Sequence, residues 1–253
     1  MTGELLSSTD GRVHRFTIQR PGRRNALIPD LARELAQGLD ALDESSAQVV
    51  LLSGAGGHFC AGLDLAWLDS LGDGATVHDM QRGLGDFQAA VLAIVRCPVP
   101  VIAVLQGAVA GFGLDLAVAC DLRIAGRGAT FTSAFSRMGL VPDGGSTFTL
   151  PRLVGPGAAL RILMASETLD AERALGLGLV DEVVDDTALE AGIDAIVNKL
   201  VSAAPSSLRA IKRLVRTGEI GALEQTLATE GAAQLQALQG PEFRRRLERF
   251  LAR

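Results

Sequence analysis

Short hydrophobic blocks, separated by glycine-rich turns, recur along the first three quarters of the chain. The segment VHRFTIQ at residues 13–19 alternates apolar and polar side chains, which predicts a half-buried strand. Runs of Val, Leu and Ile at residues 49–52, 101–105 and 122–125 predict short buried strands. Leucines recur at helical spacing over residues 31–42, which predicts a helix with one apolar face. Strands that alternate with helices in this way indicate an α/β fold.

The pattern changes near residue 187, because the strand-like blocks end there. Four amphipathic stretches follow, and proline or glycine separates each from the next. We therefore expect an α/β core over residues 1–187 and a helical segment over residues 188–253. Such a segment has to bury its apolar faces, so it is expected to pack on the core or on another copy of the chain. The predicted helices are residues 188–202, 205–216, 219–238 and 241–252.

The composition is that of a globular protein with ample material for a packed core. Hydrophobic residues make up 48% of the chain and charged residues 21%, which excludes a wholly disordered chain. The formal net charge of −5 at pH 7 argues against a nucleic-acid-binding protein with a uniformly basic surface. The three cysteines and three histidines have neither paired nor metal-ligand spacing. We therefore expect no disulfide framework and no metal.

Two features bear on where the protein resides. The first residues, MTGELLSSTDGR, lack the basic and then apolar pattern of a secretory signal, which predicts a cytoplasmic location. The most apolar stretch, residues 91–120, is interrupted by Arg96, Pro98, Pro100 and Asp115. It falls short of the roughly 18 continuous apolar residues that span a bilayer, so we expect no membrane segment.

Glycine is the unusual residue, since the chain has 29, and two glycine-flanked turns stand directly after predicted strands. The first turn is HFCAGLDL at residues 58–65, and the second is GAVAGFGLDL at residues 107–116. A helix is predicted at residues 113–120. Backbone N–H groups at a helix start are unpaired and favour negative charge, so two such turns that meet would bind an oxyanion. The alternative is that these glycines only let a helix approach a strand.

Five motifs in order along the chain carry a resemblance to a known family. They are RP at 20–21 with NAL at 25–27, FCAGLDL at 59–65, the segment 107–121 that ends in LAVACD, GLVPDGGS at 139–146, and LPRLVG at 150–155. The sequence therefore resembles the crotonase superfamily of enoyl-CoA hydratases and isomerases over nearly its whole length. The resemblance implies an α/β fold, a crotonase-like spiral of repeated ββα units with a helical C-terminal segment. It also implies assembly into homotrimers, or into hexamers that are dimers of trimers.

The resemblance also implies a site for an acyl-CoA thioester, in which coenzyme A is part of the substrate and no separate cofactor is needed. The backbone N–H groups of Leu63 and Phe112 correspond to the oxyanion hole. Trp67, Phe112 and Phe135 are expected to line the acyl pocket, and the stretch 65–86, which matches no motif, is expected to shape its far end. The residues expected to bind coenzyme A are Arg23, Arg24, Ala26, Ala61, Leu63, Asp64 and Leu65.

The acid–base groups depart from the hydratase pattern. The two glutamates of a family hydratase would fall on Asp115 and Phe135, so the water-activating pair is absent. Asp143, in the segment Val-Pro-Asp-Gly-Gly, falls instead at the position of the base in family isomerases. A Pro-Asp-Gly turn would also explain Asp143 as a turn residue. Asp115 lies in an otherwise apolar helix, where a buried carboxylate needs either a partner or a function.

These residues predict an enzyme that stabilises a thioester enolate and shifts the double bond of an enoyl-CoA. Asp143 would move a proton from C2 to C4, and Asp115 would assist. The first alternative is an enoyl-CoA hydratase in which Asp115 or Asp143 activates water. The second is a non-catalytic protein that binds acyl-CoA, or RNA through the basic clusters around Arg213 and Arg245. Nucleic acid is the less favoured ligand, because such clusters are usually solvated helix faces.

Overall fold

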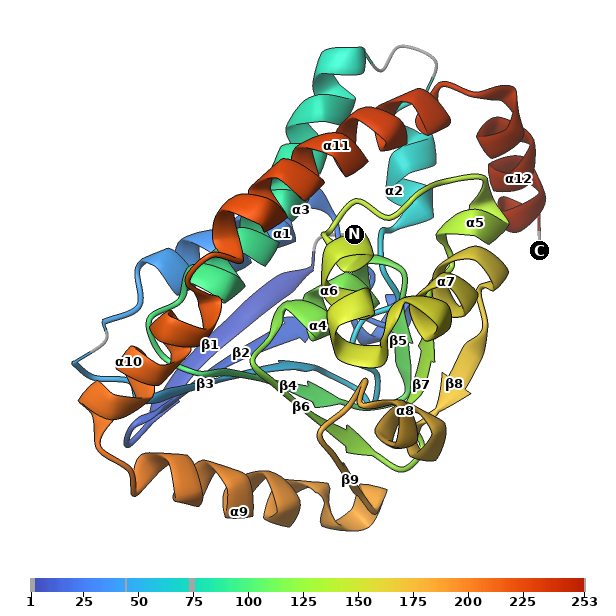
Figure 1. Ribbon diagram of the computed structural model, residues 1–253. Helices are drawn as coiled ribbons and strands as arrows, with labels where there is room; N and C mark the ends of the chain where they lie inside the picture. The colour runs from blue at the N-terminus through green and yellow to red at the C-terminus, as the bar shows by residue number, and fades with distance from the viewer. Residues whose placement is uncertain (1–2, 44, 73–75, 253) are drawn as a thin grey trace.

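A computed structural model describes residues 3–43, 45–72 and 76–252 of the chain (Figure 1). Over these residues the strands form two sheets, in the orders β1-β2-β3-β4-β6-β9 and β5-β7-β8. In the larger sheet β1 is antiparallel to β2, and the other neighbouring strands are parallel. The larger sheet comprises β1 (Glu4–Asp10), β2 (Val13–Gln19), β3 (Val49–Gly54), β4 (Val101–Leu105), β6 (Leu122–Gly126) and β9 (Glu182–Val184). The smaller comprises β5 (Ala108–Ala110), β7 (Thr130–Thr132) and β8 (Thr168–Asp170).

Helices cover both faces of the larger sheet, with α9 on one face and α1 and α3 on the other (Figure 1). Short 3-10 helices occupy Pro21–Arg23 and Asp186–Ala188. The α-helices are α1 (Pro29–Asp40), α2 (Leu65–Ser70), α3 (Val77–Arg96), α4 (Phe112–Ala119), α5 (Phe135–Met138), α6 (Ser146–Val154), α7 (Pro156–Ala165), α8 (Ala171–Leu177), α9 (Leu189–Val201), α10 (Pro205–Arg216), α11 (Ile220–Leu238) and α12 (Pro241–Leu251).

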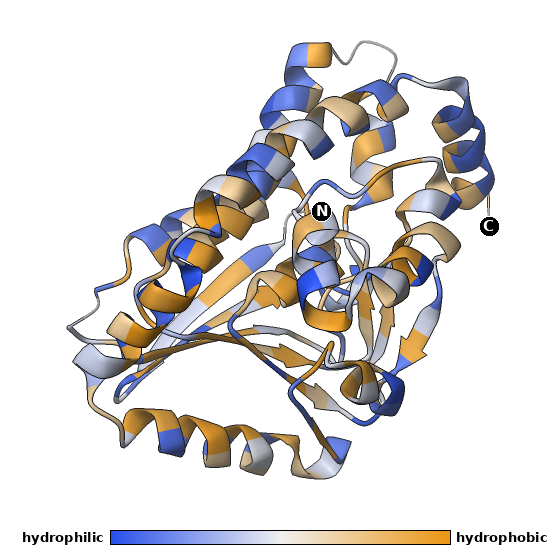
Figure 2. Cartoon of the chain, in the orientation of Figure 1, coloured by the Kyte–Doolittle hydropathy of each residue, from blue (hydrophilic) through white to orange (hydrophobic). Residues whose placement is uncertain are grey.

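The central strands are apolar on both faces, and their neighbours explain why. Successive side chains of a strand point to opposite faces of the sheet. Val50 and Leu52 of β3 pack in the core that contains α1 and α3, whereas Val49 and Leu51 pack in the core under α9. Figure 2 shows α9 and the central strands as largely hydrophobic. The short continuous apolar runs of the sequence are thus strands of a covered parallel sheet, which confirms the α/β prediction.

The structure also contains elements that the sequence pattern did not indicate. The strand β1 is mostly exposed and polar, so it has no hydrophobic alternation to reveal it. The helix α3 carries two glycines, Gly83 and Gly85, which weaken a helical pattern. Of these, Gly83 is buried against Pro29 and Trp67, where a larger residue would meet the Pro29 ring. Packing between α1 and α3 therefore explains a glycine that propensity alone disfavours.

Three of the four C-terminal helices, α9, α11 and α12, pack on the core of their own chain. Helix α11 lies along α3, and α12 contacts α5 and α2 (Figure 1). Leu223 and Leu227 of α11, with Phe243 and Leu247 of α12, are buried in the main core. These helices therefore complete the core that the strands begin. Over the described residues, none of the helices has both the length and the apolarity to cross a bilayer.

Candidate active site

The two glycine-flanked turns of the sequence lie side by side in the structure. The N–H of Cys60 donates to the carbonyl of Ala108 (3.1 Å), and the N–H of Ala110 donates to the carbonyl of Cys60 (2.9 Å). His58 accepts a hydrogen bond at Nδ1 from the N–H of Ala108 (3.0 Å), so this histidine fastens the two turns together. Main-chain pairing thus joins segments about fifty residues apart in the sequence.

Glycine is required at two positions where the turns meet. Gly62 has φ +96°, and a Cβ there would lie 2.8 Å from the carbonyl oxygen of Ala110 and 3.3 Å from the nitrogen of Phe112. A Cβ on Gly113 would lie 2.2 Å from the carbonyl oxygen of Cys60. The packing interpretation of these glycines is therefore correct. It does not compete with the oxyanion interpretation, because close approach is what brings the amides of Leu63 and Phe112 to one place.

Two unpaired N–H groups result from this arrangement. Phe112 is the first residue of α4, so its N–H has no intrahelical acceptor. Over the described ranges, neither the Phe112 N–H nor the Leu63 N–H donates a hydrogen bond to a protein acceptor. Leu63 and Phe112 line the same cavity. Main-chain donors at the wall of an apolar cavity are what an oxyanion hole requires.

The cavity has a volume of about 110 Å³, and its wall is largely apolar. Trp67, Phe112 and Phe135 all line it, and the ring of Phe87 contacts that of Phe112 edge-on at 4.7 Å between centroids. The stretch 65–86 contributes side chains from α2 and α3, while its residues 73–75 lie outside the described ranges. Asp143 and Gln234 add polar side chains to this wall. The remaining lining residues are Ala61, Gly62, Leu63, Leu65, Leu68, Leu71, Met80, Gly83, Leu84, Gly111, Ala134, Met138, Leu140 and Leu238.

A larger groove of about 860 Å³ adjoins the cavity, and the two share Ala61, Leu63, Leu65, Ala134 and Met138. Arg137 of α5, with Arg246 and Arg249 of α12, also lines it, and the sequence analysis missed all three. The signal for Arg246 and Arg249 was the basic cluster near residue 245, which resembled a solvated helix face. The seven residues that the sequence assigned to coenzyme A all line the groove: Arg23, Arg24, Ala26, Ala61, Leu63, Asp64 and Leu65.

Asp64 has a structural task within this groove. Its Oδ2 accepts a hydrogen bond from the buried guanidinium of Arg20 (2.9 Å). Its Oδ1 accepts the N–H groups of Ala66 and Trp67 at the start of α2. Although burial opposes the effect, Arg20 and these amides hold the pKa of Asp64 below its ordinary value. The Asp64 carboxylate therefore anchors α2.

Asp143 lies in the loop between α5 and α6 and is only 8% exposed. Its Oδ2 accepts a hydrogen bond from Nε2 of Gln234 (3.0 Å), whereas Oδ1 has no partner among the described residues. Burial raises the pKa of Asp143 to about 7; the negative charge of Glu230 adds to this rise, and the Gln234 hydrogen bond opposes it. A carboxyl group with this pKa exchanges protons readily near neutral pH.

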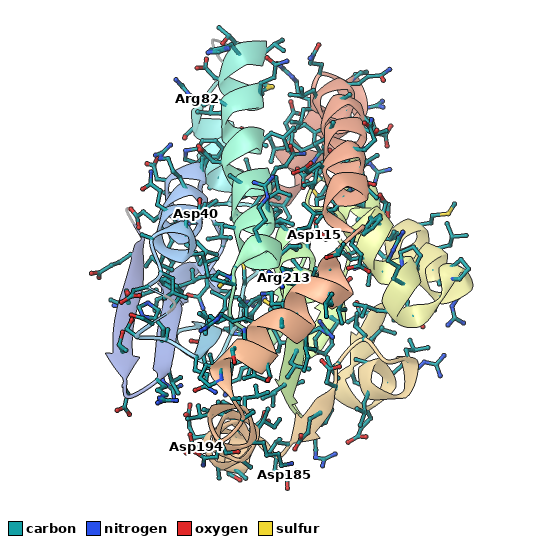
Figure 3. All side chains as sticks on the ribbon, turned by 60° about the vertical axis from the view of Figure 1, so that its left-hand side comes forward. Asp40, Arg82, Asp115, Asp185, Asp194 and Arg213 are labelled. Atoms are coloured by element: carbon teal, nitrogen blue, oxygen red, sulfur yellow. The ribbon has the colours of Figure 1, made fainter. Side chains whose placement is uncertain are left out.

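Asp115 is buried one layer behind Asp143, on α4. Its Oδ2 accepts a hydrogen bond from the N–H of Gly144 (3.0 Å), and Asp115 is not among the described residues that line the cavity. Burial, followed by the charges of Asp143 and Glu230, raises the pKa of Asp115 well above its ordinary value. In Figure 3 Asp115 lies inward, beside α11, whereas Arg82 and Asp194 lie at the periphery. The two aspartates of the sequence analysis are therefore close together but differ in access to the cavity.

Gly144 makes this proximity possible. A Cβ at this position would lie 2.6 Å from Cβ of Asp115 and 2.8 Å from a ring carbon of Phe112. The Asp-Gly-Gly segment is thus pressed against α4 at its first glycine. The turn interpretation of Asp143 explains the loop, but it leaves the buried carboxylate unexplained.

Sequence reasoning missed the contribution of α11 to this site. Glu230 and Gln234 are both buried, and they are four residues apart on one face of that helix. The available signal was a pair of polar residues at helical spacing within an apolar face. Sequence could not show which loop this face would meet. No group of His, Cys, Asp and Glu within the described ranges is arranged to hold a metal ion.

Comparisons with known proteins identify the family. The family model for enoyl-CoA hydratase/isomerase matches residues 8–253. A "Probable enoyl-CoA hydratase" of Rhodobacter capsulatus is 34% identical over 93% of this chain and 90% of its own length. The 1,2-epoxyphenylacetyl-CoA isomerase of Escherichia coli is 32% identical over 98% of this chain and 95% of its own length.

Solved structures agree with this assignment. The crystal structure of an enoyl-CoA hydratase from Mycobacterium avium subsp. paratuberculosis K-10 matches with a TM-score of 0.88 at 29% identity. The match covers 98% of this chain and 95% of that chain. The chain therefore belongs to the enoyl-CoA hydratase/isomerase family of enzymes, and the predicted crotonase-like fold is confirmed. Because the relatives carry both hydratase and isomerase names, the family alone does not select the reaction.

Proposed function

We propose that the chain is an isomerase that moves the double bond of an enoyl-CoA thioester, with Asp143 as the acid–base group. The observation that carries the proposal is the placement of one proton-exchanging carboxyl, Asp143, on the wall of an apolar cavity that also presents two unpaired N–H groups. The second carboxylate position of a hydratase is occupied by Phe135, which is buried in the same wall. A proton shuttle needs one such group, whereas the two-glutamate hydratase pattern needs two.

The reaction would begin with the thioester oxygen bound to the N–H groups of Leu63 and Phe112. Donors of this kind stabilise the enolate as its negative charge develops, and losing one typically costs about 2.7–4 kcal/mol in other enzymes. Oδ1 of Asp143, the oxygen with no partner among the described residues, takes a proton from C2. The electron pair of that C–H bond forms the C1–C2 double bond of an enolate, and the negative charge moves to the thioester oxygen. As the enolate collapses, the thioester C=O bond re-forms, the C2–C3 double bond forms, and the electron pair of the C3–C4 double bond binds a proton at C4. Asp143 supplies that proton, which can exchange with solvent before it is transferred to C4.

Coenzyme A would occupy the groove beside the cavity as part of the substrate. Arginine binds phosphate in a bidentate manner, and five arginines line the groove. They are Arg23, Arg24, Arg137, Arg246 and Arg249. Because groove and cavity share a wall at Leu63, the pantetheine arm would pass from one to the other and deliver the thioester to the two N–H groups.

A hydratase is the second candidate, and the hydratase names among the relatives favour it. In that reaction Asp143 would activate a water that adds at C3. Asp115 is less suited to the task, because it is buried behind the cavity wall. A non-catalytic binder of acyl-CoA or RNA is disfavoured, since both N–H donors and a proton-exchanging carboxyl are present together.

The test is to incubate the purified protein in deuterated water with a 2-enoyl-CoA and, separately, a 3-enoyl-CoA, and to measure the product masses. An unchanged carbon skeleton with deuterium at C2 or C4 is the expected result. Gain of a water would establish the hydratase instead. Neither exchange nor hydration with either substrate would contradict both reactions.

We also propose that the chain forms a homotrimer or a hexamer, as the resemblance implies. The helix α10 leaves Ile211, Leu214 and Val215 largely exposed, which is costly for a monomer and supports assembly. Light scattering of the purified protein measures the mass, and a monomer at micromolar concentration would contradict the proposal.

A further inference from the structure

We propose that Gln234 is the positioning residue of the active site: it holds one oxygen of the Asp143 carboxylate and leaves the other for the substrate. The inference rests on the proposed function of Asp143 as the acid–base group. It assigns a role in the reaction to α11, a helix that the sequence suggested only as part of a packing or oligomerisation segment.

Both ends of the Gln234 amide are engaged, which determines its orientation. Its Oε1 accepts a hydrogen bond from the N–H of Val141 (3.1 Å), and its Nε2 donates to Oδ2 of Asp143 (3.0 Å). The side chain is 2% exposed, so water does not compete freely for these contacts. Since a main-chain N–H can only donate, it selects the oxygen end of the amide. The nitrogen end is thereby turned to Asp143.

The same helix holds the loop on the other side of Asp143. Glu230, one turn earlier on α11, accepts hydrogen bonds from the N–H groups of Gly145 (2.7 Å) and Thr147 (3.0 Å). The loop is therefore tied to α11 before Asp143, at Asp143 and after it. A carboxylate fixed in this way keeps Oδ1 as the oxygen that is available to take a proton.

The Gln234 contact also affects the proton affinity of Asp143. A donor to the carboxylate stabilises its ionised form and lowers its pKa. The charged or titratable groups that face Asp143 are Glu230 from α11 and Asp115 from α4, and Glu230 raises its pKa. Without the donor, burial and Glu230 would act unopposed. Removal of the Gln234 amide is therefore expected to move the titration of Asp143 to higher pH.

Gln88 of α3 provides a matched control. Its Nε2 donates to the main-chain carbonyl of Asp143 (3.3 Å) and to that of Leu227 in α11 (2.7 Å). Figure 3 shows α3 and α11 side by side. Gln88 therefore contacts the same residue as Gln234, and it also contacts the helix that carries Gln234. Of the two glutamines, Gln234 is the one that contacts the carboxylate.

The experiment compares the wild type with Gln234→Met, Gln88→Met and Asp143→Asn. Methionine keeps the length of glutamine without its donors. The carboxylic-acid C=O stretch, measured by infrared spectroscopy against pH, reports the titration of Asp143 and needs no substrate. The band of Asp143 is the one that Asp143→Asn removes. In Gln234→Met its midpoint is expected to rise by about one pH unit, the effect of one hydrogen bond to a charged group. In Gln88→Met it is expected to stay in place.

Turnover of a 3-enoyl-CoA supplies the second readout. A rise of the pKa from about 7 by about one pH unit reduces kcat roughly fivefold at pH 7 and less than twofold at pH 9. KM is expected to stay within about twofold. If Gln234→Met unfolds, Gln234→Glu replaces it, since it keeps the acceptor for Val141 and also removes the donor. Its added negative charge moves the midpoint upward further.

The outcomes separate the two proposals. Equal midpoints in Gln234→Met, Gln88→Met and the wild type would overturn the role of Gln234, even if Asp143→Asn abolishes turnover. Full turnover in Asp143→Asn would overturn the proposed function itself. If Asp143→Asn keeps full turnover, an infrared shift in Gln234→Met would show that Gln234 contacts Asp143 without a role in catalysis. That result would also overturn the inference.

Discussion

The two halves of the proposed active site are built in different ways. The oxyanion half consists of the main-chain N–H groups of Leu63 and Phe112. Two short turns carry these groups, and main-chain hydrogen bonds of Cys60 with Ala108 and Ala110 hold the turns together. The acid–base half consists of the side chains of Asp115, Asp143 and Gln234, from three parts of the chain, with Glu230 behind them. Main-chain groups tolerate changes of side chain, whereas the acid–base half depends on each residue that surrounds it.

The largest expected effect isolates the acid–base half. Asp143→Asn keeps the size of the side chain but removes the base, so kcat is expected to fall about 10²–10⁴-fold. Steady-state kinetics with a 3-enoyl-CoA measure it, and binding of a saturated acyl-CoA is expected to change less than about twofold. Asp115→Asn is the matched variant, because Asp115 is also a buried aspartate but is not among the described residues that line the cavity. A loss in Asp115→Asn as large as that in Asp143→Asn would contradict this division of roles.

The second prediction contrasts Asp143 with Asp64 through the pH dependence of stability. The folded-state pKa of Asp143 is raised to about 7, so this group favours the fold at low pH, and its contribution is lost as pH rises through 7. The free energy of unfolding of Asp143→Asn, relative to that of the wild type, is therefore expected to rise by up to about 4 kcal/mol between pH 4 and pH 8.

Asp64 has the opposite sign, because its folded-state pKa is lowered. Its contribution is present above its unfolded pKa and is lost as the pH falls through the folded value. Asp64→Asn is thus expected to be less stable than the wild type at pH 7, with a difference that shrinks towards low pH. Denaturant unfolding of both variants at several pH values measures these slopes. If the free energies of unfolding of the two variants changed with pH in the same direction relative to the wild type, the opposite roles of Asp143 and Asp64 would be contradicted.

The third prediction tests the oxyanion half. Gly113→Ala places a Cβ against the carbonyl oxygen of Cys60, which cannot move without separating the two turns. Overpacking of this kind typically costs about 1–3 kcal/mol, and turnover is expected to fall with it. Gly85→Ala in α3 is the control, since a Cβ there meets nothing within 4 Å. It is expected to stabilise the helix by about 0.5–1 kcal/mol. Equal unfolding midpoints for both variants would remove the packing argument.

The smallest expected effect concerns the charge behind Asp143. Glu230→Gln removes a negative charge that raises the pKa of Asp143, so the acid limb of the pH–rate profile is expected to move to lower pH by up to about one pH unit. Glu248→Gln on the exposed face of α12 is expected to leave the profile in place. A move to higher pH in Glu230→Gln would show that Glu230 acts through loop geometry rather than charge.

Much of the fold was predictable from periodicity. Leu31, Leu35 and Leu39 form the buried face of α1, and the apolar run at residues 101–105 is β4. Edge strand β1 was not predictable, because its polar and exposed residues carry no alternation. Helix α3 was hidden by its glycines, one of which only the packing against Pro29 explains.

The sequence by itself determined the features that local chemistry specifies. Glycines at turns after buried strands specify where the backbone exposes its N–H groups, and those groups belong to short contiguous segments around Leu63 and Phe112. Tertiary structure decided which aspartate reaches the cavity. The sequence offered both Asp115 and Asp143 as acid–base candidates, but their proton affinities depend on burial and on nearby charges. Those surroundings come from α11, about ninety residues beyond Asp143, through Gln234 and Glu230. No local sequence pattern predicts this contact, because only folding brings α11 against the loop that carries Asp143.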